Sequence, residues 1–551
     1  MNVTQYTPKL FSLLKNGYSL ADLRADLIAG LTVAIVALPL AMALGIASGA
    51  SPDKGLVTAV VAGFLISLLG GSRVQIGGPT GAFVVVILNV INHHGYDGLI
   101  LATLLAGIIL IVAGYARLGQ VIKFIPHPVI TGFTAGIAVI IASTQVKDFL
   151  GLTMDKVPGD FIPKWAAYFS ALNTTNSAAL GVGLMALAII IVLRRFAPKL
   201  PGYLIAVVAA SVVVTLFHLP VETIGSRFPD IPAGLPMPQM PVIDFAKLQD
   251  IIPSAFTIAF LAGIEALLSA VVADGMTGFR HRSNQELVGQ GVANIASAFF
   301  GGLPATGAIA RTATNIKSGG RTPMAGIFHA AFLLVFVLFF TDKMVYVPMA
   351  ALAAILFIVA WGMSEIHHFI HIFTLSRTDR AVLLLTFLLT VLVDLTVAIG
   401  VGVTLASLLF MRKMTSAVEI QVGYRDDSEN EADAHQRDHL PAGVEVFTIN
   451  GPLFFGVAAD LVDTLKDMGQ VPKVLVLRMR HVPYLDASGA TALEEVAKTC
   501  HSRGTRLILS GLQSQPYKIL SRGLFKTHKG EVEHCSDYEE AFALARKMVA
   551  G

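Results

Sequence analysis

The chain has 551 residues, of which 54% are hydrophobic and only 14% are charged. Soluble proteins carry roughly 25% charged residues, so this composition excludes an ordinary soluble enzyme and indicates an integral membrane protein in contact with the lipid bilayer. The net charge of +3 is too small to indicate a nucleic-acid partner. Residues 1–20 lack the features of a cleaved signal peptide, and we expect them to remain as a cytoplasmic N-terminal segment.

Apolar segments recur from residue 21 to residue 413, and we interpret this stretch as a transmembrane transport domain. A helix needs about 20 apolar residues to span a bilayer, within a range of roughly 17–25. Several segments reach that length, whereas Thr80–Asn92 and Ala308–Lys317 are too short, and each follows a cluster of Gly and Pro. The predicted segments are 26–47, 56–69, 80–92, 98–114, 128–146, 178–194, 203–217, 252–273, 286–300, 308–317, 323–340, 346–361, 380–393 and 395–411.

The positive charges of the loops test this count of fourteen independently. If the N-terminus lies in the cytoplasm, every second loop should be rich in Lys and Arg. The loops at those positions carry more Lys and Arg than the loops between them, so we expect fourteen crossings of a bacterial inner membrane with both termini in the cytoplasm. The cytoplasmic set comprises Arg73, Arg117, Lys123, Arg194, Arg195, Lys199, Arg280, Arg282, Lys317, Arg321, Arg377 and Arg380.

The sequence changes character after the last apolar segment. Residues 414–442 include a polar, acidic stretch with few aromatic residues, which is typical of a flexible linker or insert. Residues 443–551 form an α/β pattern long enough for a small cytoplasmic domain with its own core. Its predicted strands are 444–449, 474–477 and 507–510, and its predicted helices are 490–499 and 539–549.

The two short apolar segments follow similar sequences, GGPTGA at Gly77–Ala82 and GGLPATGA at Gly301–Ala308. They are third and tenth among the fourteen, and an odd offset of seven reverses the direction of crossing, which predicts a 7+7 inverted repeat. Paired interrupted helices indicate a transporter's binding site at the membrane midplane. A helix that begins there directs unpaired N–H groups and its positive dipole end at the centre, so two facing ends would bind a small anion. Ordinary Gly/Pro breaks between packed helices are the alternative.

Glu265 is the acidic residue that lies well inside segment 252–273. An ionisable group at that depth costs about 2.5–3.5 kcal/mol on insertion scales, which suggests a function. Because burial favours the neutral carboxyl, Glu265 is our candidate proton carrier, and Ser269 lies one turn further on the same face. A structural carboxyl that is hydrogen-bonded between helices is the alternative.

Arg311 lies one turn into the second short helix, where its charge could complete an anion site. The alternative is that Arg311 pairs with Glu265 and holds two helices together.

Leu40, Met42 and Leu44 follow a proline and could form an apolar wall of the site or simply pack between helices. Asp274, near a cytoplasmic helix end, is expected to be solvated or to cap the helix, and Ser283–Glu286 is expected to be a structural capping box.

At these residues the sequence closely resembles the sulfate permease (SulP) family of anion transporters. The resemblance covers nearly the whole chain, and its C-terminal part resembles a STAS domain through NGPLFFGVA and LDASG. The stretches that carry the resemblance in the membrane part are ADLIAGLTVAIVALPLAMALGIASG (21–49), GGSRVQIGGPTGAF (70–83), ELVGQGVANIASAFFGG (286–302), IARTATNIKSGGRT (309–322) and VLVDLTVAIGVGV (391–403).

The resemblance implies a homodimer of fourteen-span subunits with two parts. Segments 1–4 and 8–11 would form a transport core that moves against a gate of segments 5–7 and 12–14 in an elevator-like cycle. The substrate would lie between the third and tenth helices, without a cofactor or a metal ion. The implied substrate-binding residues are Gly78, Thr80, Gly81, Ala82, Gly307, Ala308, Ile309, Ala310, Arg311, Leu40 and Leu44.

Three positions indicate which branch of the family this chain resembles. Sodium-using bicarbonate importers carry Asp where this chain has Glu265 and Thr where it has Ser269, and they lack an arginine matching Arg311. The pattern here resembles the proton-coupled branch, which includes C4-dicarboxylate carriers, so we expect proton symport of a C4-dicarboxylate or sulfate. A sodium-dependent bicarbonate symporter or an anion exchanger is the alternative, because Thr80 matches a sodium-site threonine. A membrane-anchored sensor is less consistent with paired half-helices, since a sensor needs no midplane site.

The STAS domain departs from the pattern of the phosphorylated anti-anti-sigma proteins. Ala487 stands where that pattern has its phosphorylated serine, between Asp486 and Ser488. We therefore expect this domain to act as a scaffold or to bind a cytoplasmic protein partner rather than to switch by phosphorylation at that position.

Overall fold

The computed structural model describes residues 3–550 except 16, 121–125, 155–156, 199, 233, 242–247, 394, 417, 423–440, 456, 458–471 and 529. The chain forms two units, Met1–Thr404 and Leu405–Gly551. The unit boundary falls within helix α17 (Leu395–Ser416). The predicted linker at 414–442 lies largely outside the described residues.

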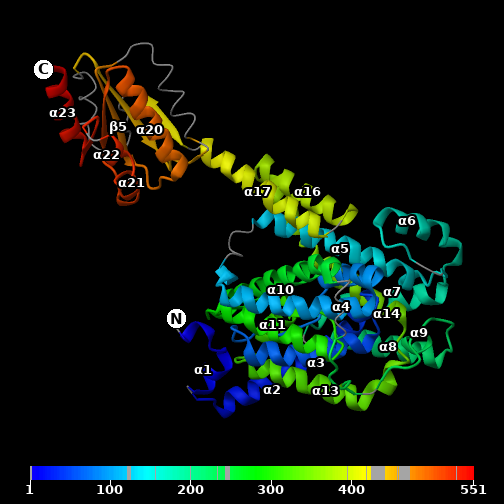
Figure 1. Ribbon diagram of the computed structural model, residues 1–551. Helices are drawn as coiled ribbons and strands as arrows, with labels where there is room; N and C mark the ends of the chain where they lie inside the picture. Colours follow the sequence, from blue (N-terminus) through cyan, green and yellow to red (C-terminus); the bar gives the residue numbers. More distant parts are fainter. Residues whose placement is uncertain are drawn as a thin grey trace. The chain divides into compact units, whose positions relative to one another are not determined.

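The first unit is built from helices (Figure 1). Its long helices are α2 (Leu20–Ala47), α3 (Pro52–Leu69), α4 (Phe83–Tyr115), α5 (His127–Leu150), α7 (Ser177–Phe196), α8 (Gly202–Leu216), α10 (Leu248–Thr277), α11 (Ser283–Phe299), α13 (Met324–Met344), α14 (Met349–Met363) and α16 (Arg377–Leu392). Its short elements are the 3-10 helices Val3–Tyr6 and Leu172–Thr174, the helices α1 (Lys9–Lys15), α6 (Phe161–Ser170), α9 (Ile224–Arg227), α12 (Ile309–Lys317) and α15 (Ile366–Thr374), and the strands β1 (Gly77–Gly78) and β2 (Thr306–Gly307).

Each of the fourteen predicted apolar segments falls on a helix. The third and fourth join in α4, whose helical geometry is broken at Gly95, with φ 74° and ψ −178°. This conformation suits glycine because it has no Cβ. Among the described residues, nine helices are long and apolar enough to cross a membrane. The fold is therefore that of a multi-pass membrane protein, as the composition predicts.

The helices of the first unit contact one another in two groups. One group contains α2, α3, α4, α10, α11, α12 and α13, and Figure 1 shows α4, α10 and α11 side by side. The other contains α5, α7, α8, α14 and α16. Helix α2 contacts both, through α13 and α3 on one side and through α8 and α14 on the other. The first group contains the segments that the family resemblance assigns to a core, and the second contains those assigned to a gate except segment 14, which lies on α17.

The predicted capping box at Ser283–Glu286 is wrong. Helix α11 begins at Ser283 with Arg282 as its N-cap, so Glu286 is the fourth helical residue instead of the third that a capping box requires. The buried Glu286 carboxylate instead accepts hydrogen bonds from the backbone N–H groups of Gly71 and Ser72, at 2.7 and 2.9 Å. It thereby fixes the loop after α3 to the start of α11.

The opposite loop is fixed by a matching contact. The backbone N–H of Leu303, after α11, donates to the hydroxyl of Thr58 in α3 at 2.6 Å. Helices α3 and α11 therefore each hold the loop that follows the other, and both loops lead into the strands β1 and β2. Burial of these polar groups is stabilising only because each has its partner.

The second unit is a five-stranded sheet with helices, as its α/β pattern predicts. The strands lie in the order β3-β4-β5-β6-β7, with β3 antiparallel to β4 and the other neighbours parallel. All the predicted strands and helices are present, and the strands β3 and β7 and the helices α21 and α22 are additional. The elements are β3 (Glu419–Val422), β4 (Val444–Asn450), β5 (Val474–His481), α20 (Ala487–Ser502), β6 (Arg506–Ser510), α21 (Ser514–Leu520), α22 (Leu524–Thr527), β7 (Val532–Cys535) and α23 (Tyr538–Ala550).

The alternation of side chains along β5 explains the helices on both faces of this sheet. Leu475 and Leu477 share a cluster with residues of α20 such as Leu493, whereas Val474 and Val476 share another with residues of α23. Successive residues of a strand point to opposite faces, and a strand buried on both faces has a continuous apolar sequence. Figure 1 shows α20 and α23 on opposite sides of β5.

Candidate anion site

Two short strands bring the interrupted helices together. β1 pairs with β2 in antiparallel register, with Gly77 opposite Gly307 and Gly78 opposite Thr306. Helix α4 begins at Phe83 and α12 at Ile309, shortly after these strands. The structure therefore brings the two predicted Gly-containing motifs, which lie far apart in the sequence, into one crossing.

The start of α12 supplies polar groups to this crossing. Its N-cap is Ala308, and the first bond of its backbone ladder runs from the N–H of Thr312 to the carbonyl of Ala308, at 2.9 Å. The N–H groups of the first helical turn have no partner within a helix. Ile309 and Ala310 in that turn are exposed, whereas Ala308 and, at the start of α4, Gly81 and Ala82 are buried. The accessible part of the α12 N-terminus therefore carries no charged side chain, and its backbone N–H groups suit the approach of an anion.

Glu265 of α10 lies next to the start of α4. The hydroxyl of Thr80 donates to Oε2 of Glu265 at 2.7 Å, and both side chains are half-buried. Ser269 is buried and lies 3.2 Å from the hydroxyl of Thr312, between their oxygen atoms. Thr312 in turn accepts from the backbone N–H of Ile76 at 3.0 Å. Two residues of α10 thus contact different interrupted segments, since Ser269 contacts α12 and Glu265 contacts Thr80, which precedes α4.

Arg311 is buried beneath the crossing, with 2% of its surface exposed. Its Nη2 donates to the backbone carbonyl of Pro79 at 2.5 Å, whereas Nε and Nη1 have no hydrogen-bond partner among the described residues. No ion pair with Glu265 is present between these two described side chains. Arg311 therefore links α12 to the approach of α4 and keeps two donors available.

Gly78 provides the space that Arg311 occupies. Its φ is +147°, a conformation that favours glycine, and a Cβ there would lie 2.4 Å from Nη1 of Arg311. A Cβ at Gly307 would lie only 1.5 Å from Nε2 of Gln75. Both glycines are needed for close packing at the crossing.

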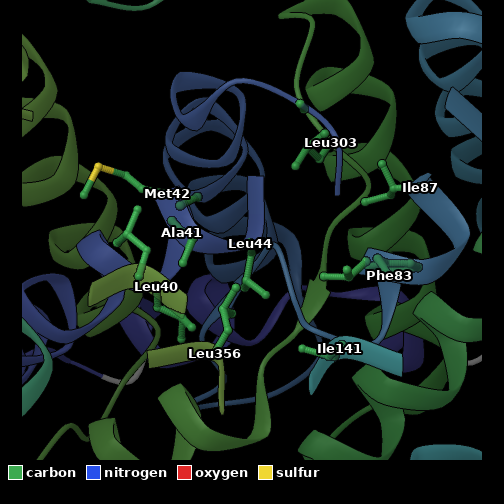
Figure 2. Close-up of a cluster of buried hydrophobic side chains, with 14 of the residues drawn as sticks. Leu40, Ala41, Met42, Leu44, Phe83, Ile87, Ile141, Leu303 and Leu356 are labelled. Carbon is green, nitrogen blue, oxygen red and sulfur yellow. The ribbon is translucent and has the colours of Figure 1, made fainter. Parts of the chain in front are cut away.

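Leu40 and Leu44 of α2 lie in a cluster of buried apolar side chains (Figure 2). Figure 2 shows them near Phe83 of α4, Leu356 of α14 and Ile141 of α5, and Met42 belongs to the same cluster. Because α5 and α14 belong to the second helix group, this cluster joins the two groups beside the crossing. Leu40 and Leu44 therefore make the packing contacts that the sequence analysis gave as one of two alternatives.

Three polar residues of the crossing were missed from the sequence. Thr312 connects Ser269 to the segment before β1, and Asn294 of α11 holds the backbone of Ala305 through two hydrogen bonds of 2.9 Å. Gln75 is buried with no partner for its amide atoms among the described residues. The signal available for Asn294 was a polar amide within an apolar segment. Thr312 has several polar neighbours within its short segment, and Gln75 lies in a loop, so neither residue stands out from its surroundings.

Asp274, expected to be solvated or capping, lies near the end of α10. It accepts from the backbone N–H of His281 at 2.9 Å and contacts the His281 ring at 2.7 Å. Asp274 therefore fixes the turn between α10 and α11, apart from the crossing.

Comparison with known proteins decides the family. The sulfate permease family matches residues 23–386, and the STAS domain matches residues 435–532. The chain belongs to the sulfate permease family. This confirms the resemblance of the motifs, the helical membrane-transporter fold and the additional STAS domain.

The named relatives of this chain are transporters rather than enzymes. YvdB of Bacillus subtilis, whose name proposes sulfate as its substrate, is 42% identical over 533 residues, which cover 96% of this chain and 99% of YvdB. The bicarbonate transporter BicA of Picosynechococcus is 32% identical over 536 residues, or 93% of each chain. The present chain is accordingly an anion transporter of the family.

Solved structures agree with this fold. The transmembrane domain of a cyanobacterial BicA has a TM-score of 0.63 at 35% identity and covers 70% of this chain and 99% of that domain. The murine Solute Carrier 26 family member A9 has a TM-score of 0.88 at 19% identity and covers 99% of this chain and 94% of that one. The second likeness concerns the fold alone.

The two roles considered for Arg311 give different results in a double-mutant cycle. Arg311→Ala is expected to weaken apparent substrate affinity by roughly 10- to 100-fold, because a hydrogen bond from a charged group contributes about 1.5–3 kcal/mol. With Glu265→Gln as the second variant, losses of thermal stability are expected to add within about 0.5 kcal/mol. Arg321→Ala, at an exposed arginine, is the control for affinity. If the stability loss of the double variant departs from the sum of the two single losses by well over about 0.5 kcal/mol, Arg311 and Glu265 form a pair instead.

Proposed function

We propose that this sulfate permease is a proton-coupled symporter of a small dianion, either a C4-dicarboxylate or sulfate. The observation that carries the proposal is the buried Arg311, which has two donors without a partner beside two helix N-termini. A buried cation without a counter-charge is costly. An anion at the crossing would offset that cost, and Arg311, Gly78, Thr80, Gly307 and the first turn of α12 would bind it.

The charges at the crossing favour a dianion together with a proton. Each helix N-terminus contributes about half a positive charge, and Arg311 contributes a full one. With Glu265 ionised the sum is about +1, and with Glu265 protonated it is about +2. Protonation of Glu265 therefore matches the site to a dianion, which supports coupled binding of proton and substrate.

A sodium-dependent bicarbonate symporter is the second candidate. Its support is the 32% identity to BicA, which is named a bicarbonate transporter, and the position of Thr80, whose hydroxyl contacts Glu265. In that case a cation other than the proton would neutralise Glu265, and a monoanion would bind.

Alternating access would follow from motion of the first helix group against the second. The apolar contacts between α2, α4, α5 and α14 would form part of the interface that slides in an elevator-like cycle. We further propose a homodimer in a bacterial inner membrane with both termini in the cytoplasm, as the charges of the loops suggest. The STAS domain, with Ala487 directly after the N-cap Asp486, would bind a cytoplasmic partner without phosphorylation at that position.

Uptake into proteoliposomes tests this function. Labelled fumarate, sulfate and bicarbonate are supplied under a proton gradient, a sodium gradient or neither, with the membrane potential held at zero. We expect a dianion to accumulate when the interior is alkaline and sodium is absent. Accumulation of bicarbonate that requires sodium would replace the proposal with the second candidate, and one-for-one exchange without either gradient would identify an exchanger.

A further inference from the structure

A groove on the second helix group has none of the candidate anion-site residues in its lining. It has a volume of about 870 Å³ and is lined by α5, α7 and α14 and the start of α15. Apart from two arginines and Ser364, its lining side chains are apolar, among them Ile191, Phe357 and Trp361. Trp361 is 68% exposed, so an apolar surface remains uncovered along these helices.

The polar end of the groove is positively charged. Arg194 and Arg195 lie in the last turn of α7, and both are exposed. No hydrogen bond or ion pair joins either of them to another described residue. The nearest acidic residue along the lining segment, Glu365, is 3.3 Å from His368 between Oε2 and Nδ1. The end of the groove thus carries two cations that form no ion pair within the part of the chain that the structure describes.

Helix directions place the arginine end at one membrane boundary. Helices α7 and α14 both end there, at Phe196 and Met363. Helix α5 begins there, because the ring of His127 contacts the ring of His368 in α15, with centroids 5.8 Å apart. Tryptophan is typical of such boundaries, where one part of its ring is apolar and the other is wet. The groove therefore extends from a polar boundary toward the apolar interior.

We propose that this groove binds an anionic phospholipid, with its phosphate at Arg194 and Arg195 and an acyl chain along Ile191, Ala138 and Phe357. The apolar lining suits an acyl chain, and two unpaired arginines suit a negatively charged headgroup. A zwitterionic lipid would fill the same apolar surface, but the cation of its headgroup cancels the charge of its phosphate, so it brings no net negative charge to the two arginines. A protein segment would bind here only if it had carboxylates at the arginine end followed by a long apolar stretch. An anionic phospholipid has both features, a negatively charged headgroup and an apolar chain.

The test is competitive lipid binding to the full-length protein, measured by native mass spectrometry and by lipid extraction from nanodiscs of mixed composition. Phosphatidylglycerol and phosphatidylcholine with identical acyl chains serve as probes. We expect wild type to retain phosphatidylglycerol preferentially. Arg194→Gln/Arg195→Gln should lower that preference by roughly 5- to 30-fold, since each basic residue near a membrane surface contributes a factor of about five.

Two variants separate the headgroup from the acyl chain. Arg280→Gln/Arg377→Gln removes the same charge from exposed arginines outside the groove and should leave the preference unchanged. Ala142→Phe, which fills the groove, should reduce retention of both lipids. Equal retention of the two lipids by wild type would overturn the proposal, as would an unchanged preference in the groove double variant. If Ala142→Phe lowers the fraction of dimer and leaves lipid retention unchanged, the proposal is wrong and the groove instead binds a second copy of the chain.

Discussion

Glu265→Gln is expected to abolish proton-driven accumulation while leaving anion binding and exchange intact. The amide mimics the protonated carboxyl, and its oxygen can still accept the hydrogen bond of Thr80, which measures 2.7 Å to the native carboxylate. The geometry of the crossing is therefore preserved while the titratable group is removed. The charge at position 265 can then no longer change by proton binding. Binding of the substrate is therefore no longer linked to binding of a proton.

The expected size of this effect follows from the driving force. A gradient of one pH unit supplies about 1.4 kcal/mol for each proton, or up to a tenfold accumulation for one coupled proton. Wild type should approach that ratio at zero membrane potential, and Glu265→Gln should stop at equal concentrations inside and outside. Labelled substrate in proteoliposomes measures both values, and counterflow measures exchange.

Asp274→Asn provides a matched control on the same helix. Asp274 fixes the turn after α10 through His281 and lies apart from the crossing, so its variant should keep proton-driven accumulation. Thr80→Val removes the hydrogen bond to Glu265 and should weaken coupling without removing the carboxyl. If Glu265→Gln concentrates substrate as wild type does, Glu265 is structural and the proton-coupling proposal fails.

The arrangement of helices was predictable because its signal is local in the sequence. Long apolar segments predict membrane helices, and the repeated Gly/Pro motifs before residues 80 and 308 marked the two places where the backbone is not helical. The same locality explains the strands and helices of the STAS domain, whose apolar runs are short and regular.

Long-range partners were not predictable in the same way. The carbonyl that accepts from Arg311 belongs to Pro79, 232 residues away, and nothing in the sequence around either residue specifies the other. Glu286 matched a capping box locally, yet its partners are the N–H groups of Gly71 and Ser72. Buried polar groups take whichever partner the fold brings near, so their roles required the structure.

Gly307→Val is expected to abolish transport while leaving folded protein in the membrane. A Cβ at this position would lie 1.5 Å from Nε2 and 2.6 Å from Cδ of Gln75, so β2 or Gln75 must move. Because β2 leads directly into α12, a shift there would displace the helix N-terminus at which we propose that the anion binds. Uptake should fall to the level of empty vesicles, with size-exclusion chromatography confirming that the protein remains folded.

Gly181→Ala in α7 is the matched control, since a Cβ there meets no atom within 4 Å. It should transport as wild type does, because alanine is a better helix former than glycine. Gly78→Val should resemble Gly307→Val for a different reason, because its Cβ would displace Arg311 and its φ is unfavourable for valine. Wild-type affinity in both valine variants would remove the paired helix ends from the proposed site.

A rescue experiment identifies the cause of the Gly307 defect. The three nearest atoms that a new Cβ would meet all belong to the side chain of Gln75, so the smaller variant Gly307→Ala should be repaired by Gln75→Ala. We expect Gly307→Ala to lose most transport and the double variant to regain a large part of it, since the space vacated by the amide accommodates the added methyl group. Recovery would show that the glycine is required for close packing against Gln75. If the double variant stays inactive while Gln75→Ala alone transports, the glycine is needed for its backbone, and the N–H groups at the start of α12 become the next positions to test.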